Sequence, residues 1–184
     1  MFTHDLGGGL ELRLLEHRHA PELLEAVRAN AAQLDRFLNI ARELHDLERA
    51  RQRIQVALDR FAAGHGLEAG IWFEGHLIGT VALHGGGRTR IEVGYWLTEP
   101  FQGRGIATRA AAAVTDHAFG GLGLHRVEMR CAVDNVRSRA VPERLGFRLE
   151  GILRGSYQVG DRFIDEALYA LTADAWVAPS ERRL

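Results

Sequence analysis

Lysine is absent from this chain of 184 residues, so its 23 basic residues other than histidine are all arginine. The absence excludes catalysis through a lysine Schiff base and excludes a P-loop, in which a lysine contacts the phosphates. Cysteine occurs once, at Cys131, so the chain forms no internal disulfide. A single cysteine fits a reducing compartment, and we expect the protein in the cytoplasm.

Long apolar runs are missing as well. No stretch approaches the roughly 20 apolar residues of a membrane helix, and residues 1–9 lack the features of a signal peptide, so we expect no membrane partner. The 24 acidic residues offset the arginines to a net charge of −1, which does not favour a nucleic-acid partner. The nine histidines show no HExxH or zinc-finger spacing, so no metal site is predicted.

The remaining composition, 46% hydrophobic and 26% charged, is that of a globular protein, and we expect one domain over residues 1–184. Hydrophobic periodicity predicts the order β α α β β β α β α β β. Strands are expected at 10–14, 71–73, 77–83, 90–97, 127–133, 147–153 and 162–171, and helices begin near 21, before 54, after 103 and before 145. This order predicts an α/β (α+β) fold, with a mixed, mostly antiparallel twisted sheet of about seven strands flanked by helices.

The loop from Gln102 to Thr108 lies between a predicted strand and a predicted helix, and we interpret it as an anion-binding turn. The first turn of a helix has backbone N–H groups without partners at the positive end of the helix dipole, so it can hold a phosphate. Gly103 and Gly105 permit close approach and positive φ. Arg104 and Arg109 add positive charge nearby.

Two other interpretations of this loop remain open from the residues alone. In the first, the loop is a simple turn that connects a strand to a helix. In the second, it is a dinucleotide-binding fingerprint with Glu128 as the downstream acidic residue. The fingerprint is disfavoured because Thr108 stands at the third glycine position and the preceding strands form a meander.

Together with two other motifs, the loop resembles the GNAT superfamily of acyl-CoA-dependent N-acyltransferases. The pyrophosphate loop of that superfamily has Gln or Arg, two residues, Gly, any residue, then Gly or Ala, which Gln102, Gly105 and Ala107 match. Within the superfamily, the chain resembles the RimJ/RimL branch, which acetylates the N-termini of ribosomal proteins. The residues that carry this resemblance are 94–97 and Asp134, Asn135, Ser138, Glu143, Leu145, Gly146 and Phe147. The resemblance covers about residues 10–171.

The resemblance implies acetyl-CoA as the acyl donor, with no metal. It also implies that the strands 90–97 and 126–133 splay apart around the pantetheine arm. The residues expected at the cofactor are Leu97, Gln102, Gly103, Arg104, Gly105, Ile106, Ala107, Thr108, Asn135 and Ser138. Members of the family are often dimers, so a homodimer is an expected assembly.

Asn135 and Ser138 match positions that contact the pantetheine end in this branch, and Ser138 is the candidate to protonate or orient the departing thiolate. From the residues alone, the alternative is that both are helix caps. Pro142 removes a hydrogen bond from a helix unless it lies in the first turn, so this helix is expected to begin late.

Acetyl transfer needs a neutral amine and therefore a group that accepts its proton. Glu92 is the first candidate base because it shares a strand face with Gly94 and Trp96. Asp165 is the second because it matches an acidic position of the branch, and either residue can instead be a solvated charge. Main-chain N–H groups near Leu97 are candidates to polarise the thioester carbonyl.

The acceptor is expected to be a primary amine, either a protein N-terminus or a small molecule such as a polyamine or an aminoglycoside. An α-amine with a pKa near 8 is about 10% neutral at pH 7, whereas a lysine amine is well under about 1% neutral, so a site without a strong base favours the α-amine. Tyr157 stands where ribosomal-protein enzymes of the branch often have an acidic residue, and this difference weakens the prediction of a specific ribosomal substrate. The alternative outside the enzymes is a silent acyl-CoA-binding module.

Cys131 lies on a strand expected to flank the pantetheine arm. Its place in the apolar alternation of that strand predicts a buried thiol. A thiolate nucleophile would need a nearby base, and no histidine is paired with it in the sequence.

Overall fold

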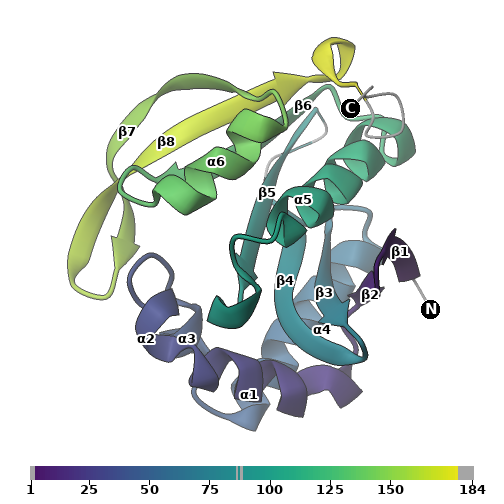
Figure 1. The fold of residues 1–184 in the computed structure, drawn as a ribbon, viewed down its shortest axis with the longest axis vertical. Helices are drawn as coiled ribbons and strands as arrows, with labels where there is room; N and C mark the ends of the chain where they lie inside the picture. The colour runs from purple at the N-terminus through teal and green to yellow at the C-terminus, as the bar shows by residue number, and fades with distance from the viewer. Residues whose placement is uncertain (1–2, 86, 88, 178–184) are drawn as a thin grey trace.

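The structure of this protein is a computed structural model that describes residues 3–85, 87 and 89–177. Within them, eight strands form one twisted sheet in the order β1-β2-β3-β4-β5-β6-β8-β7 (Figure 1). The strands are β1 Thr3–Gly7, β2 Leu10–Leu14, β3 Leu67–Phe73, β4 His76–His84, β5 Arg90–Leu97, β6 Arg126–Ala132, β7 Arg148–Val159 and β8 Arg162–Thr172. The α-helices are α1 Ala20–Ala29, α2 Ala31–Leu34, α3 Ile40–Glu43, α4 Leu47–Ala62, α5 Ile106–Asp116 and α6 Val136–Arg144.

The N-terminal part of the chain differs from the prediction in three ways, one of which is the additional short helix α3. β1 is an additional edge strand, so the sheet has eight strands where about seven are predicted. Its first three residues are exposed, which is why no apolar alternation reveals it. The first predicted helix is divided at Asn30, whose φ of −119° is not helical. The side chain of Asn30 donates to the carbonyl of Ala26 (2.9 Å), a local bond by which asparagine competes with helix propagation.

From β3 onward, the kind and order of the predicted elements are confirmed. β7 extends to Val159, beyond the predicted end at residue 153. Its pairing with β8 shifts register between Leu153 and Tyr157, and this irregularity interrupts the sequence alternation there.

The helices form two layers on the sheet. α5 packs on β4 and β5 on one face, with α6 beside it on β6, and α1 and α4 pack against β4 and β3 (Figure 1). Side chains of β5 alternate between two cores: Ile91 and Val93 lie in the core that includes α5, whereas Trp96 lies in the core that includes α1 and α4. Because Ala110 and Ala111 of α5 are small and fully buried, α5 lies close to the sheet.

β5 and β6 form the parallel pair of the sheet, and they pair over three positions, Arg90–Glu92 with Arg126–Glu128. Both strands are described in full, and their ladder pairing does not continue beyond these positions. The predicted splay of the two central strands is therefore confirmed. α5 connects them, so the loop that opens α5 lies next to the gap.

Among the described residues, no helix combines the length and apolar character needed to cross a membrane.

Candidate functional site

The loop between β5 and α5 is open on the side that a ligand would approach. Gly103 and Gly105 both have φ of +74°, and Gly105 is the N-cap of α5 in the left-handed conformation. A Cβ placed on either glycine meets nothing within 4 Å. The N–H groups of Ile106 to Thr108 form the first turn of α5, where a helix offers no internal acceptor. This arrangement can hold an anion by main-chain groups.

Gln102 fixes this loop to its neighbours. Its Nε2 donates to the carbonyl of Leu97 at the end of β5 (3.0 Å), and its Oε1 accepts from Nη1 of Arg137 at the start of α6 (3.3 Å). The loop, β5 and α6 are thereby joined by one side chain. Sequence reasoning did not single out Arg137. The signal was its place one residue before Ser138, in the first turn of a helix.

The two arginines predicted near the anion have different surroundings. The exposed Arg104 lies with its guanidinium over the ring of Phe101, 5.3 Å from the centroid. Arg109 donates to the carbonyls of Leu6 and Gly7 at the end of β1 (2.6 Å to Gly7), so its guanidinium is held against that strand.

Thr108 carries a buried polar atom at this turn. Among the described residues, its Oγ1 has no hydrogen-bond partner. Unpartnered buried hydroxyls are rare in proteins because they lose hydration without compensation. Together with the open glycines, Thr108 Oγ1 fits a bound acceptor such as a phosphate oxygen. Ile106 points the other way, into the core.

The start of α6 brings Asn135 and Ser138 together. Asn135 caps the helix, since its Oδ1 accepts from the N–H of Ser138 (3.2 Å). The expectation of a late start is wrong: α6 begins at Val136, and Pro142 lies inside it. Capping and a role at the cofactor are compatible, because only Ser138 N–H is used in the cap and the Ser138 hydroxyl is left for other partners.

A cluster of three side chains surrounds that hydroxyl, namely Tyr95, Cys131 and Ser138. Ser138 Oγ lies 3.3 Å from Cys131 Sγ and 3.2 Å from Tyr95 Oη. Cys131 is 3% exposed, which confirms the prediction of a buried thiol. Burial raises the pKa of this thiol and so disfavours a thiolate nucleophile. Burial also raises the pKa of Tyr95 well above its ordinary value. All three groups are therefore neutral.

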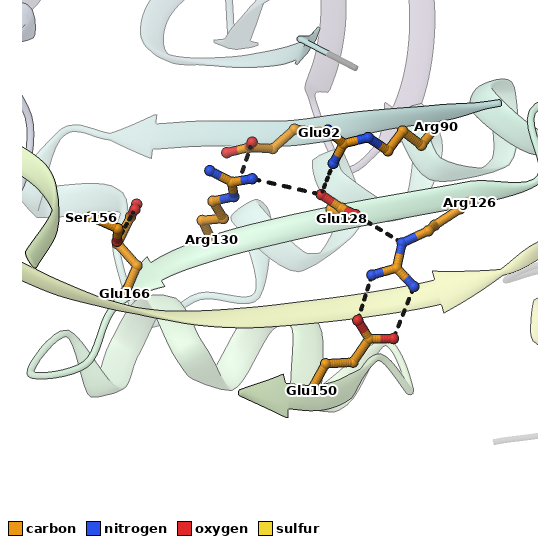
Figure 2. A network of polar contacts seen from close by, with 8 residues as sticks. All are labelled: Arg90, Glu92, Arg126, Glu128, Arg130, Glu150, Ser156 and Glu166. Carbon is orange, nitrogen blue, oxygen red and sulfur yellow. Dashed lines mark hydrogen bonds and ion pairs between the residues drawn. The ribbon is translucent and has the colours of Figure 1, made fainter. Parts of the chain in front are cut away.

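Glu92 lies on the opposite face of the sheet from this cluster. It shares the face of Trp96 by alternation, as predicted, whereas Tyr95 points toward α6. Glu92 pairs with Arg130 across the gap (3.5 Å; Figure 2). Burial raises the pKa of Glu92, although Arg130 acts in the opposite direction. A group in the gap would therefore have a hydroxyl on one side and a carboxylate on the other.

Charged residues secure the point where β5 and β6 begin to diverge. Glu128 is 5% exposed and accepts from Arg90 (2.9 Å) and from Arg126 (2.8 Å). Arg126 also donates to Glu150 on β7 (2.8 Å), so the network crosses from β5 to β7 (Figure 2). Arg130 is a third partner of Glu128 (3.9 Å), and a buried carboxylate paired with three arginines holds the paired ends of the strands in register.

The second candidate base, Asp165, is exposed, and its Oδ1 accepts from the N–H of Gly155 (2.8 Å) at the irregular part of β7. Its neighbour Glu166 pairs in register with Ala132, which alternation places on the face of Glu92. Glu166 accepts from Ser156 (2.7 Å), lies on the Glu92 side in Figure 2, and contributes to the raised pKa of Glu92. The structure therefore brings Glu166, not Asp165, to the face of Glu92. Alternation along β8 puts the two residues on opposite faces, but the pairing with β6 is needed to show which of them shares the face of Glu92.

A groove of about 660 Å³ lies beyond the end of β6. Its walls come from the segment after α2, the end of β6 and the start of β8: Arg36, Phe37, Ala132, Val133, Asp134, Arg162, Phe163, Ile164 and Asp165. Asn39, two residues after Phe37, joins this segment to the β7–β8 turn, because its side chain donates to the carbonyl of Gln158 (2.6 Å) and accepts from the N–H of Gly160 (3.1 Å). Two segments distant in sequence thus enclose the groove.

Within residues 3–85, 87 and 89–177, no group of three or more His, Cys, Asp or Glu side chains is placed to hold a metal ion.

Comparison with known proteins agrees with this geometry. A family model described as an acetyltransferase (GNAT) domain matches residues 9–148. The chain belongs to the GNAT acetyltransferase family. It is 35% identical over 179 residues to the putative ribosomal N-acetyltransferase YdaF of Bacillus subtilis, covering 96% of this chain and 98% of that protein. It is 31% identical over 180 residues to the ribosomal-protein-serine acetyltransferase of Escherichia coli, covering 94% and 98%.

Solved GNAT structures share the fold over nearly the whole chain. A structure described as the ribosomal α-N-protein acetyltransferase RimL in complex with coenzyme A has a TM-score of 0.89 at 27% identity, covering 95% of this chain and 99% of that one. In that protein, the coenzyme is joined to a cysteine by a disulfide. A probable acetyltransferase has the same TM-score of 0.89 at 34% identity, covering 95% and 99%.

Proposed function

We propose that this GNAT protein transfers the acetyl group of acetyl-CoA to the α-amine of a protein N-terminus, with a ribosomal protein as the substrate class. The observation that carries the proposal is the gap between β5 and β6, with the open loop at one end, Ser138 on one face and Glu92 on the other. The named activities of the bacterial relatives support the choice of acceptor.

The donor half of the site is assigned to the cofactor residues predicted from the sequence. The N–H groups from Gly103 to Thr108 and the side chain of Thr108 receive the diphosphate, with Arg104 and Arg137 as nearby charges. Leu97 and Asn135 border the gap that receives the pantetheine arm. A solved relative that holds coenzyme A in the same fold supports this assignment.

The reaction uses both faces of the gap. The amine nitrogen attacks the thioester carbonyl and the carbon–sulfur bond breaks, which leaves an amide and a thiolate. Glu92 accepts the proton that the amine loses, for which a raised pKa is suitable, since a base is most effective when its pKa lies near the working pH. Ser138 donates a hydrogen bond to the thiolate and passes it a proton as its own hydroxyl takes one from solvent, which leaves the serine neutral. Main-chain N–H groups near Leu97 polarise the carbonyl.

The groove beyond β6 is assigned to the acceptor. Its volume of about 660 Å³ is large enough for the first residues of an extended peptide. Asp165 lines this groove with its carboxylate bonded to Gly155, so we assign it to the wall and leave Glu92 as the base. We expect the enzyme to act in the cytoplasm, as a ribosomal substrate would require. We also predict a homodimer, which a measurement of the molecular mass in solution would test.

The test combines calorimetry with acetyl-CoA and a thiol-release assay over a panel of amines. The panel contains a peptide whose α-amine is its only amine, a peptide with a blocked N-terminus and one lysine, spermidine and kanamycin. We expect turnover on the first peptide alone. Turnover on spermidine or kanamycin would favour a small-molecule enzyme, and binding without any turnover would favour a silent acyl-CoA-binding module.

A further inference from the structure

Pro142 changes the hydrogen bonding of α6 at Ser138. It is the residue four positions after Ser138, and in a regular helix its N–H would donate to the Ser138 carbonyl. Proline has no N–H, so that donor does not exist. The helix nevertheless continues to Arg144.

Tyr95 of β5 supplies a donor at that position. Its hydroxyl donates to the Ser138 carbonyl at 2.9 Å, a normal length for this bond. The two residues are 43 positions apart and belong to different elements, so the contact ties the start of α6 to the strand that borders the gap. Because burial raises the pKa of Tyr95, the hydroxyl keeps the proton that it donates.

The same hydroxyl constrains the proton of Ser138. A tyrosine hydroxyl has one proton, and when that proton is donated to the carbonyl, Tyr95 Oη can only accept from Ser138 Oγ, 3.2 Å away. The other neighbour of Ser138 Oγ is Cys131 Sγ, 3.3 Å away, and sulfur is a weak acceptor. Ser138 therefore directs its proton toward two neutral acceptors, and a leaving thiolate, because it is charged, is a stronger hydrogen-bond acceptor than either.

We propose that Tyr95 is a positioning residue that replaces the missing N–H of Pro142, and so orients Ser138 to protonate the leaving thiolate. The proposal rests on the proposed function, because the orientation of Ser138 matters for turnover only if a thiolate leaves beside it. It predicts that Tyr95 and Pro142 act as one unit. Either donor, the tyrosine hydroxyl or a peptide N–H at position 142, is sufficient to hold the Ser138 carbonyl.

The test is a double-mutant cycle with Y95F, P142A and Y95F/P142A, measuring kcat, KM for acetyl-CoA and the urea midpoint of unfolding. We expect Y95F to lower kcat about tenfold, the value of one hydrogen bond, with little change in KM. P142A should resemble wild type. In the double variant the new N–H should restore kcat to within about threefold of wild type and should restore the urea midpoint.

Tyr169 offers a matched control, because its hydroxyl also bonds to α6, donating to Glu143 (2.6 Å) and accepting from Arg139 (3.0 Å). The effect of Y169F should be the same with and without P142A. The proposal is overturned if Y95F leaves both kcat and the urea midpoint unchanged, or if P142A fails to rescue Y95F.

Failure of the proposed function is distinguishable from failure of this inference. A wild-type protein that acetylates no α-amine contradicts the proposed function. In that case the urea midpoints of the same four proteins still decide whether Tyr95 and Pro142 are coupled, because that measurement needs no substrate.

Discussion

The two faces of the gap between β5 and β6 differ in their chemistry. On the α6 face, Tyr95, Cys131 and Ser138 are neutral and contact one another. On the other face, Glu92 forms an ion pair with Arg130. Acetyl transfer removes a proton from an amine and adds one to a sulfur, and a carboxylate on one side with a hydroxyl on the other suits those opposite tasks.

This difference means that each half of the site should fail separately when it is altered. A change in the loop that opens α5 should weaken acetyl-CoA binding, whereas a change at Glu92 should slow turnover with acetyl-CoA binding intact. Variants that break this separation would contradict the assignment of the faces.

The largest effect is expected from G105D, which places a carboxylate where the diphosphate would lie. Repulsion between charges about 4 Å apart in a partly buried site is worth about 4 kcal/mol, so affinity for acetyl-CoA should fall about 1000-fold by calorimetry. G64D is the matched control, because Gly64 has a φ of +71° and is equally open but lies after α4. If G105D and wild type bind acetyl-CoA with equal affinity, the loop is not part of the donor site.

The next effect is expected from E92Q, which should lower kcat about 100-fold, as typical for loss of a general base, with acetyl-CoA affinity unchanged. The wild-type rate should fall as pH drops through the raised pKa of Glu92, and E92Q should lack that dependence. E166Q is the comparison, since Glu166 shares the face. If E166Q rather than E92Q removes the pH dependence, the base is Glu166.

The same variant has a predicted effect on stability. A carboxyl group whose pKa is raised by burial stabilises the fold most below its unfolded pKa, and that contribution is lost as pH rises through the folded pKa. E92Q should therefore be at least as stable as wild type at pH 7 in urea unfolding, in spite of the lost ion pair. A marked loss of stability would mean that the pair with Arg130 outweighs burial.

A smaller effect is expected from E128Q on the network that secures the strand ends. Glu128 is buried with three arginine partners, so its loss should reduce the free energy of unfolding by about 2 kcal/mol. E150Q is the control, because Glu150 is 44% exposed and its pair with Arg126 should be worth under about 1 kcal/mol. Urea unfolding of both variants measures the difference.

The smallest effect concerns Cys131, whose labelling reports whether the reactive end of the donor lies on the neutral face. Its burial and raised pKa predict slow reaction with a small maleimide, and acetyl-CoA should slow the reaction about tenfold further. As the chain has one cysteine, the reading is unambiguous. Labelling that acetyl-CoA leaves unchanged would place the thioester elsewhere, and G105D should show no protection.

The parts of this site that were predictable from the sequence depend on local chemistry. The turn at Gly103 and Gly105 needs positive φ, which glycine adopts without strain, and the cap at Asn135 follows from its position before a helix. The face of Glu92 follows from alternation along one strand. Each of these inferences uses residues close together in the chain.

The parts that were not predictable depend on how distant segments meet. The contact between Tyr95 and Ser138 requires the position of α6 over β5. The choice between Asp165 and Glu166 depends on the register of β8 against β6. Single-strand patterns carry no information on either.

Because the pairing between β5 and β6 ends early, backbone amides and carbonyls of the two strands lie unpaired with each other on either side of the gap. Unpaired strand groups of this kind are ordinarily found at the edges of a sheet and not in its middle. These groups are natural partners for the amide-bearing arm of a bound donor. Occupancy should therefore make the sheet continuous, and amide hydrogen exchange in the second half of both strands should slow when the donor is present.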